Sequence, residues 1–179
     1  LPTASRIVRR VLLLSPMNHH HPNQPHCGAL VVYPGCKARE AVGPMSVFDY
    51  ANVHLRENGR PDGYVVRVVA EQAGPVRSDT LMALEATETL GNLAHGGVGC
   101  TVIVVGSRNI ELALAASPGL VAWAAQVAPE VDRMIALCSG SFFLAAAGLL
   151  DGRRAATHWS VADLLQQRHP SIQVDADAI

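Results

Sequence analysis

Charged side chains are scarce in this sequence of 179 residues. Only 16% of the residues are Asp, Glu, Lys or Arg, and the formal net charge is −1. A balance this close to neutral excludes a disordered acidic tail and a basic nucleic-acid-binding surface, because both need many charges of one sign. Hydrophobic residues make up 49% of the chain, which is enough for the core of one domain. We therefore expect one folded domain that does not bind DNA itself.

Long apolar runs are also missing. The longest runs, such as residues 142–150, are interrupted by Gly148 and end before Asp151. They fall well short of the roughly 20 residues that a membrane-spanning helix needs. Near the N-terminus, arginines precede the apolar residues 11–14, but this run is too brief for the core of a signal peptide. The pattern predicts a cytoplasmic protein.

Cysteine is present, but its spacing shows no pairs. The intervals match neither a zinc site nor a disulfide framework, and the four positions are Cys27, Cys36, Cys100 and Cys138. We expect all four to be reduced thiols.

The first 27 residues lack periodicity. Pro, Asn and His are frequent there, so residues 1–27 are predicted to form a disordered or loosely ordered leader. The histidines at 19–21, together with His26 and Cys27, carry imidazole and thiolate groups that suit a transition metal. Prolines interrupt this cluster, however, and the preferred interpretation is a polar leader. We expect no metal and no cofactor.

Regular patterns begin at residue 28. Continuous apolar runs, typical of strands buried on both faces, occur at 29–33, 64–69 and 101–105, with a weaker one at 134–137. Helical patterns lie between them, at 42–57, 109–116, 120–127 and 141–150. This alternation predicts an α/β domain with a parallel sheet covered on both faces. Residues 76–90 do not fit the alternation and indicate short strands or a hairpin.

The sharpest local signal surrounds Cys138. An apolar run leads into the cysteine, and a helical pattern starts at Ser141. This is the pattern of a nucleophile elbow, whose strained turn needs small neighbours, here Ala136 and Gly140. The positive end of the following helix would favour the thiolate over the thiol. The alternative is a buried structural cysteine at the end of a core strand.

A thiolate nucleophile needs a base, and His158 lies twenty positions after Cys138. One helix and a return turn at Gly152 would bring His158 back toward the cysteine. A histidine beside a tryptophan, here Trp159, is equally well explained as a packed, half-buried side chain. The spacing leaves both interpretations open.

The segment from Cys138 to Trp159, continued by residues 169–175, closely resembles the PfpI/ThiJ-like domain at the N-terminus of many AraC-type transcription regulators. Residues 33–35 and 43–52 match the first strand and helix of that family, so the resemblance covers about residues 28–179. It implies a class I glutamine amidotransferase-like fold, which is a flavodoxin-like three-layer sandwich with a central, mostly parallel sheet. Relative to that fold, the sequence is expected to be truncated at its C-terminal part, with a DNA-binding helix-turn-helix domain downstream.

The resemblance also implies site residues. Glu40 falls where the superfamily places an acidic residue near the cysteine, and such a carboxyl group can share a proton with the thiolate or act as general acid. The alternative is a solvated residue in the first turn of a helix. Gly106 and Ser107 end the strand beside the cysteine, where a backbone N–H would join that of Ser139 in an anion-binding hole next to Gly140. Many enzymatic relatives have a second glycine in place of Ser107, which counts against hydrolysis.

Three functions are compatible with these residues. The first is a sensory domain in which Cys138, Glu40 and His158 line a pocket for a small-molecule effector, with DNA contacted only through an attached domain. The second is a cysteine-dependent hydrolase or hydratase of the amidase or isonitrile hydratase type, with Cys138 as nucleophile and Glu40 as acid and base. The third is a redox sensor whose thiolate is oxidised to sulfenic acid. The motifs in residues 148–175 favour the first, and regulators of this type commonly form homodimers.

Overall fold

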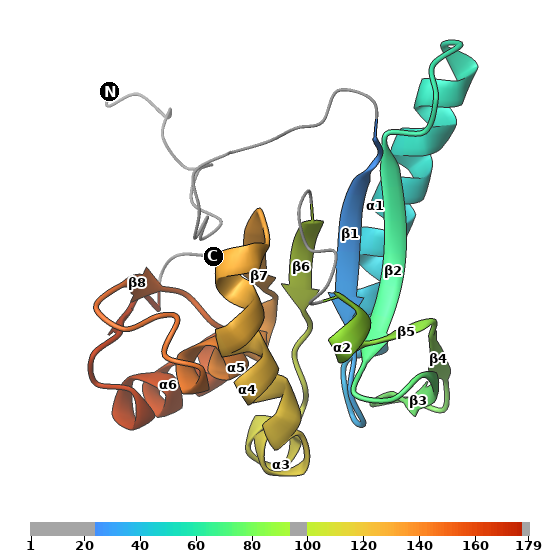
Figure 1. The fold of residues 1–179 in the computed structure, drawn as a ribbon. Coiled ribbons are helices and arrows are strands. Elements are labelled where there is room, and N and C mark those ends of the chain that lie inside the picture. The colour runs from blue at the N-terminus through green and yellow to red at the C-terminus, as the bar shows by residue number, and fades with distance from the viewer. Residues whose placement is uncertain (1–23, 94–99, 177–179) are drawn as a thin grey trace, which may run out of the picture.

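The computed structural model describes residues 24–93 and 100–176. A five-stranded sheet lies at the centre, and its neighbouring strands run parallel in the order β5-β2-β1-β6-β7 (Figure 1). These strands are β1 His26–Val31, β2 Tyr64–Ala70, β5 Glu88–Thr89, β6 Cys100–Val104 and β7 Arg133–Ala136. The predicted α/β domain with a parallel sheet is therefore confirmed.

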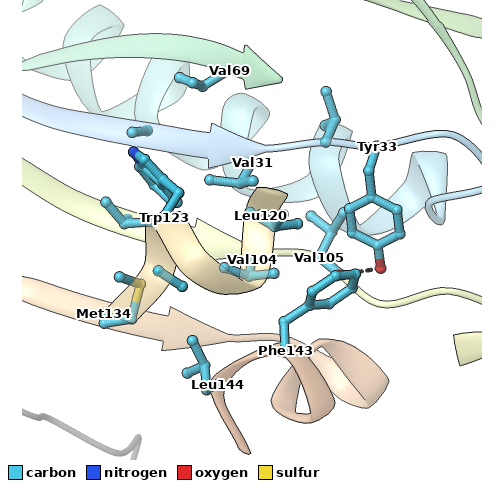
Figure 2. Close-up of a cluster of buried hydrophobic side chains, with 14 of the residues drawn as sticks. Val31, Tyr33, Val69, Val104, Val105, Leu120, Trp123, Met134, Phe143 and Leu144 are labelled. Carbon is cyan, nitrogen blue, oxygen red and sulfur yellow. Dashed lines mark hydrogen bonds between the residues drawn. The ribbon is translucent and has the colours of Figure 1, made fainter. Parts of the chain in front are cut away.

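The central strands are continuously apolar because both faces of the sheet are covered. Side chains alternate between the two faces of a strand, so Gly28 and Val31 of β1 point to opposite sides. A Cβ atom on Gly28 would come within 2.9 Å of the Phe48 ring, which places the first helix close against that face. On the other face, Val31 lies in the cluster that contains Leu120 and Trp123 (Figure 2).

The helices lie between the strands in the chain, as predicted. They are α1 Ala38–Glu57, α2 Leu90–Leu93, α3 Ile110–Ala116, α4 Pro118–Val127, α5 Ser141–Ala146 and α6 Ala162–Arg168, with 3-10 turns η1 Ala128–Glu130, η2 Cys138–Gly140 and η3 Trp159–Val161. Helix α1 runs along β1 and β2, whereas α4 and α5 pack against each other (Figure 1). Within the described residues, no single helix has the length and apolar composition to cross a membrane, and only the bent pair Ile110–Ala116 with Pro118–Glu130 meets that criterion, at an angle of 81°.

Two helix boundaries differ from the predicted ones by four residues. Helix α1 begins at Ala38 instead of residue 42 and continues through Pro44. Helix α5 stops at Ala146 instead of residue 150, because Gly148 takes the left-handed conformation with φ of 73°. The amides of Gly148 and Leu149 then bond back to the carbonyls of residues 145 and 144, which is the hydrogen-bond pattern of a glycine C-cap.

The irregular segment after β2 forms a hairpin, as expected. Strand β3 Gly74–Arg77 pairs antiparallel with β4 Ala83–Ala86. A second small pair, β8 Arg154–Ala155 with β9 Gln173–Val174, is parallel and was not predicted.

The core lies between the sheet and the helices that pack on it (Figure 2). Its two largest polar-tipped side chains find partners: the Tyr33 hydroxyl donates to the Val105 carbonyl at 2.7 Å, and the Trp123 indole donates to the Leu90 carbonyl at 2.8 Å. The Tyr33 and Phe143 rings pack with their centroids 4.7 Å apart. The core therefore extends from α4 to the residues that follow β1, where the site begins.

The expectation of four reduced thiols is wrong for one pair. Cys27 and Cys100 form a disulfide between β1 and β6. The two residues are 73 positions apart in sequence, but the parallel register of the strands places them opposite each other. Sequence spacing carries no trace of such a pairing, because it arises only when the sheet forms.

Most of the predicted leader lies outside the described residues. The histidines at 19–21, which the sequence offers as possible metal ligands, are among the residues outside the described part of the chain. The last two residues assigned to the leader, His26 and Cys27, belong to β1.

Candidate functional site at Cys138

Cys138 lies on the sharp turn between β7 and α5 that the sequence predicts. It is half-buried and has φ of 52°, a positive value found at no other non-glycine residue among those described. A residue with a side chain adopts this conformation only when its surroundings hold it there. The Thr157 hydroxyl donates to the Cys138 carbonyl at 3.1 Å, and the Ser141 hydroxyl donates to Thr157 at 2.8 Å. These contacts hold the turn from the side of β8.

Gly140 is required by close packing behind the cysteine. A Cβ atom at this position would lie 2.5 Å from the Val104 carbonyl oxygen of β6. The small residue predicted for the elbow is thus needed because the turn presses against the neighbouring strand.

Lys37 is the closest polar partner of the thiol and was missed by the sequence analysis. Its ammonium nitrogen lies 3.0 Å from Cys138 Sγ and 3.4 Å from Glu40 Oε1. Partial burial acts to lower the pKa of Lys37, but the hydrogen bond to Cys138 and the charges of Cys138 and Glu40 outweigh it and raise that pKa. An ammonium at this distance stabilises a thiolate. Helix α5, with only six residues, adds a short dipole to this effect.

One feature of the sequence is consistent with a functional role for Lys37, namely its position after a buried strand. In open α/β sheets, functional groups gather beyond the carboxyl ends of the strands. Lys37 follows β1 directly after the Pro34-Gly35 turn and precedes the first residue of α1. It is also the only lysine in the sequence.

Glu40 belongs to the same cluster. Its Oε2 accepts the Gly106 amide at 2.7 Å, and its Oε1 faces Lys37. In the structure, Lys37 connects Glu40 with Cys138. The carboxylate therefore positions the ammonium that contacts the thiol, and the predicted proton exchange between Glu40 and Cys138 would require Lys37 to move.

Two of the backbone amides proposed for an anion-binding hole, those of Gly106 and Ser107, already have partners. The Gly106 N–H donates to Glu40, and the Ser107 N–H donates to the Ser139 hydroxyl at 3.0 Å. Ser139 in turn donates to the Ser107 carbonyl at 2.8 Å. A Cβ atom at Gly106 would lie 2.8 Å from Ser139 Oγ, so glycine is needed for this close approach. These bonds fasten the end of β6 to the elbow.

His158 takes part in a local contact. Its Nδ1 accepts the Ser160 amide at 3.2 Å and so caps η3, and its ring lies against Trp159 at 5.4 Å. In the part of the chain that the structure describes, no hydrogen bond joins His158 to Cys138. Of the open interpretations, the geometry favours the packed side chain, and Thr157 is the residue of this segment that reaches the elbow.

An open pocket of about 420 Å³ adjoins Lys37. Its lining consists of Lys37, Arg39, Asp79, Thr80 and Arg108. Asp79 accepts the Ala38 amide at 3.1 Å and the Arg108 Nε at 2.9 Å. Desolvation acts to raise the pKa of Asp79, but these hydrogen bonds and the charge of Arg108 lower it, so the carboxylate stays ionised. The β3–β4 hairpin thus forms one wall of the pocket.

Within residues 24–93 and 100–176, no three His, Cys, Asp or Glu side chains gather in a way that could hold a metal ion. The chemistry available at this site is that of a thiol, an ammonium, two carboxylates and two guanidinium groups.

Comparison with known proteins identifies the fold family. The model of the DJ-1/PfpI family matches residues 29–176. The chain belongs to the DJ-1/PfpI family. A protein of Streptomyces lividans, described as an uncharacterized protein in the cpoL 5′ region, is 35% identical over 82% of this chain and 97% of its own length. The crystal structure of an AraC family transcriptional regulator from Pseudomonas putida matches with a TM-score of 0.69 at 22% identity, covering 84% of this chain and 76% of that one.

Two further relatives of this DJ-1/PfpI domain carry functional names. The HTH-type transcriptional regulator CdhR of Pseudomonas aeruginosa is 33% identical over 63% of this chain. The isonitrile hydratase of Pseudomonas putida is 34% identical over 56% of this chain. The matched regions span only 32% of the regulator and 42% of the hydratase.

Proposed function

We propose that this DJ-1/PfpI domain is the ligand-sensing part of an AraC-type transcription regulator. In this proposal, a small-molecule effector binds beside Cys138 and controls DNA binding by a helix-turn-helix domain elsewhere in the same protein. The regulator acts in the cytoplasm as a homodimer. The similarity to the regulator CdhR, which is far longer than the matched region, supports a domain that works as part of a larger chain.

One observation carries the proposal. Cys138 has an ammonium beside it instead of a histidine base, and two of the amides expected to bind an oxyanion, those of Gly106 and Ser107, donate to Glu40 and Ser139. Acyl transfer needs a proton acceptor for the nucleophile and free donors for the oxyanion. A thiol without a histidine base, beside Gly106 and Ser107 amides that are already engaged, is better suited to contacting a ligand in the open pocket than to turning it over.

The proposal is tested with the full-length gene product and its promoter. Gel shifts at fixed salt, with a panel of amino acids and organic acids, should show DNA affinity that depends on one of these compounds. A ligand acts only if it binds the two states of the regulator unequally. Replacing Cys138 by Ala should therefore change the response to ligand more than the basal affinity. A gene that encodes no helix-turn-helix region contradicts the proposal.

The alternative is a cysteine-dependent hydrolase or hydratase with Cys138 as nucleophile and Glu40 as acid and base. It is favoured by the similarity to isonitrile hydratase and by the presence of both residues in one cluster. Steady turnover of an isonitrile or an amide by the purified chain, abolished in Cys138→Ala, would establish it in place of the sensor.

A further inference from the structure

The three cationic side chains that line the pocket differ in whether they already have hydrogen-bond or ion-pair partners. Lys37 is engaged by Cys138 and Glu40, and Arg108 uses its Nε on Asp79. Arg39 is exposed and, among the described residues, makes no side-chain hydrogen bond or ion pair. Lys37 and Arg108 are thus committed to partners inside the site, whereas the Arg39 guanidinium at the mouth of the pocket has no such partner in the part of the chain that the structure describes.

The donors left over have a defined geometry. A guanidinium presents its N–H groups in a planar fork that fits the two oxygens of a carboxylate. Arg39 offers its complete fork, and Arg108, whose side chain is 75% exposed, keeps its terminal NH₂ groups available after bonding Asp79 through Nε. Both lie at the N-terminal end of α1, a helix of 20 residues whose dipole also favours negative charge.

We infer that this pocket binds the carboxylate group of a small organic acid, with Arg39 and Arg108 as its donors, and brings the ligand to Cys138. The planar fork of the Arg39 guanidinium pairs with the two oxygens of a carboxylate. The inference rests on the proposed sensing function and names its ligand class. Lys37 joins the two parts of the site, because it lines the pocket and contacts the thiol.

Two alkylating reagents of nearly the same size test the inference. Iodoacetate carries a carboxylate, and iodoacetamide is its uncharged counterpart. In both reactions, Cys138 Sγ attacks the methylene carbon, the C–S bond forms, the C–I bond breaks and iodide leaves, while the thiol proton passes to solvent. Both reagents react with the thiolate, so the ratio of their rates is independent of how much thiolate is present. Rates at Cys138 are read by mass spectrometry of the 179-residue chain.

The expected result is a ratio of iodoacetate to iodoacetamide rates about tenfold above that of a free thiol peptide, which corresponds to about 1.4 kcal/mol of differential binding. In Arg39→Gln, the ratio of iodoacetate to iodoacetamide rates should fall most of the way to the value of the peptide. Arg60→Gln is the matched control, because it removes the same charge from an exposed arginine just beyond the other end of α1, about 30 Å away. A ratio equal to that of the peptide, or one lowered equally by both substitutions, overturns the inference.

A competition experiment distinguishes a pocket that prefers carboxylates from one that prefers phosphate. At constant ionic strength, succinate should slow the iodoacetamide reaction of the wild-type chain more than inorganic phosphate does, and Arg39→Gln should abolish this protection. Stronger protection by phosphate overturns the choice of carboxylate. The alkylation experiments contain no DNA, so a negative result in them says nothing about the sensing function. A negative gel-shift result, in turn, does not contradict carboxylate binding in this pocket.

Discussion

The single lysine of this chain governs its most accessible thiol. Cys36 is fully buried, and desolvation raises the pKa of its thiol, whereas Cys138 is half-buried and contacts the Lys37 ammonium. Reactivity toward an alkylating reagent requires both access and thiolate. Cys138 should therefore react before Cys36 in the folded protein.

Replacing Lys37 by Met should slow the iodoacetamide reaction of Cys138 about tenfold at neutral pH. The substitution keeps the length of the side chain but removes the charge 3.0 Å from the sulfur. Nearby cations are among the groups that make a cysteine thiol reactive, and a tenfold change in rate corresponds to about 1.4 kcal/mol. Lys37→Arg retains the charge and should restore most of the rate. Equal rates in the wild type and Lys37→Met would show that the ammonium does not act on the thiol.

The elbow depends on how closely β6 and η2 approach. Gly140 lies where a methyl group would meet the Val104 carbonyl at 2.5 Å, and neither backbone can retreat without breaking the contacts between β6 and β7. Overpacking of this kind costs about 1–3 kcal/mol.

Gly140→Ala should accordingly lower the free energy of unfolding in urea by about 1–3 kcal/mol. Gly91→Ala is a suitable control, because Gly91 is exposed and, among the described residues, the nearest atom to a methyl group there is Thr89 Oγ1, at an ordinary 3.9 Å. The control should change stability by no more than about 0.5 kcal/mol. If the two variants unfolded at the same urea concentration as the wild type, the close approach at Gly140 would be absent in solution.

The elements of the sheet were predictable because burial on both faces leaves a continuous apolar run in the sequence. This signal located β1, β2, β6 and β7, and the small residues around Cys138 located the elbow. Helix ends were less predictable. Helix α1 begins four residues before the predicted start at residue 42, where the Ala38 amide bonds to Asp79.

At the scale of the whole molecule, the features that the sequence did not reveal are contacts between distant segments. Lys37 meets Cys138 across 101 positions, and Cys27 meets Cys100 across 73. Such pairs are set by the register and order of the strands, which local patterns do not encode. At His158 the spacing left both a pair with Cys138 and a packed side chain open, and in the structure Thr157 faces the elbow while the His158 ring caps η3.

The folded state as a whole should lose stability as the solution becomes alkaline. Burial raises the pKa of Cys36 above its ordinary value of 9.0 and that of Tyr33 above 10.0. In the unfolded chain both groups lose their protons near the ordinary values, so above about pH 9 the unfolded state binds fewer protons than the folded state. Stability then falls with rising pH, by up to about 1.4 kcal/mol per pH unit for each group. Below pH 8 both groups are protonated in both states and contribute no slope.

Urea unfolding between pH 7 and pH 11 separates the two groups. Cys36→Ala should make the unfolding free energy fall less steeply between about pH 9 and pH 10, by at most about 1.4 kcal/mol per pH unit, and Tyr33→Phe should do so only above about pH 10. Each substitution also removes packing or a hydrogen bond, here the one from Tyr33 to Val105, but that loss lowers stability equally at every pH and leaves the slope intact. If Cys36→Ala had the same slope as the wild type from pH 9 to pH 10, the Cys36 thiol would be open to solvent, and the packing of the Tyr33–Lys37 turn against the hairpin, on which the pocket depends, would be different from that described above.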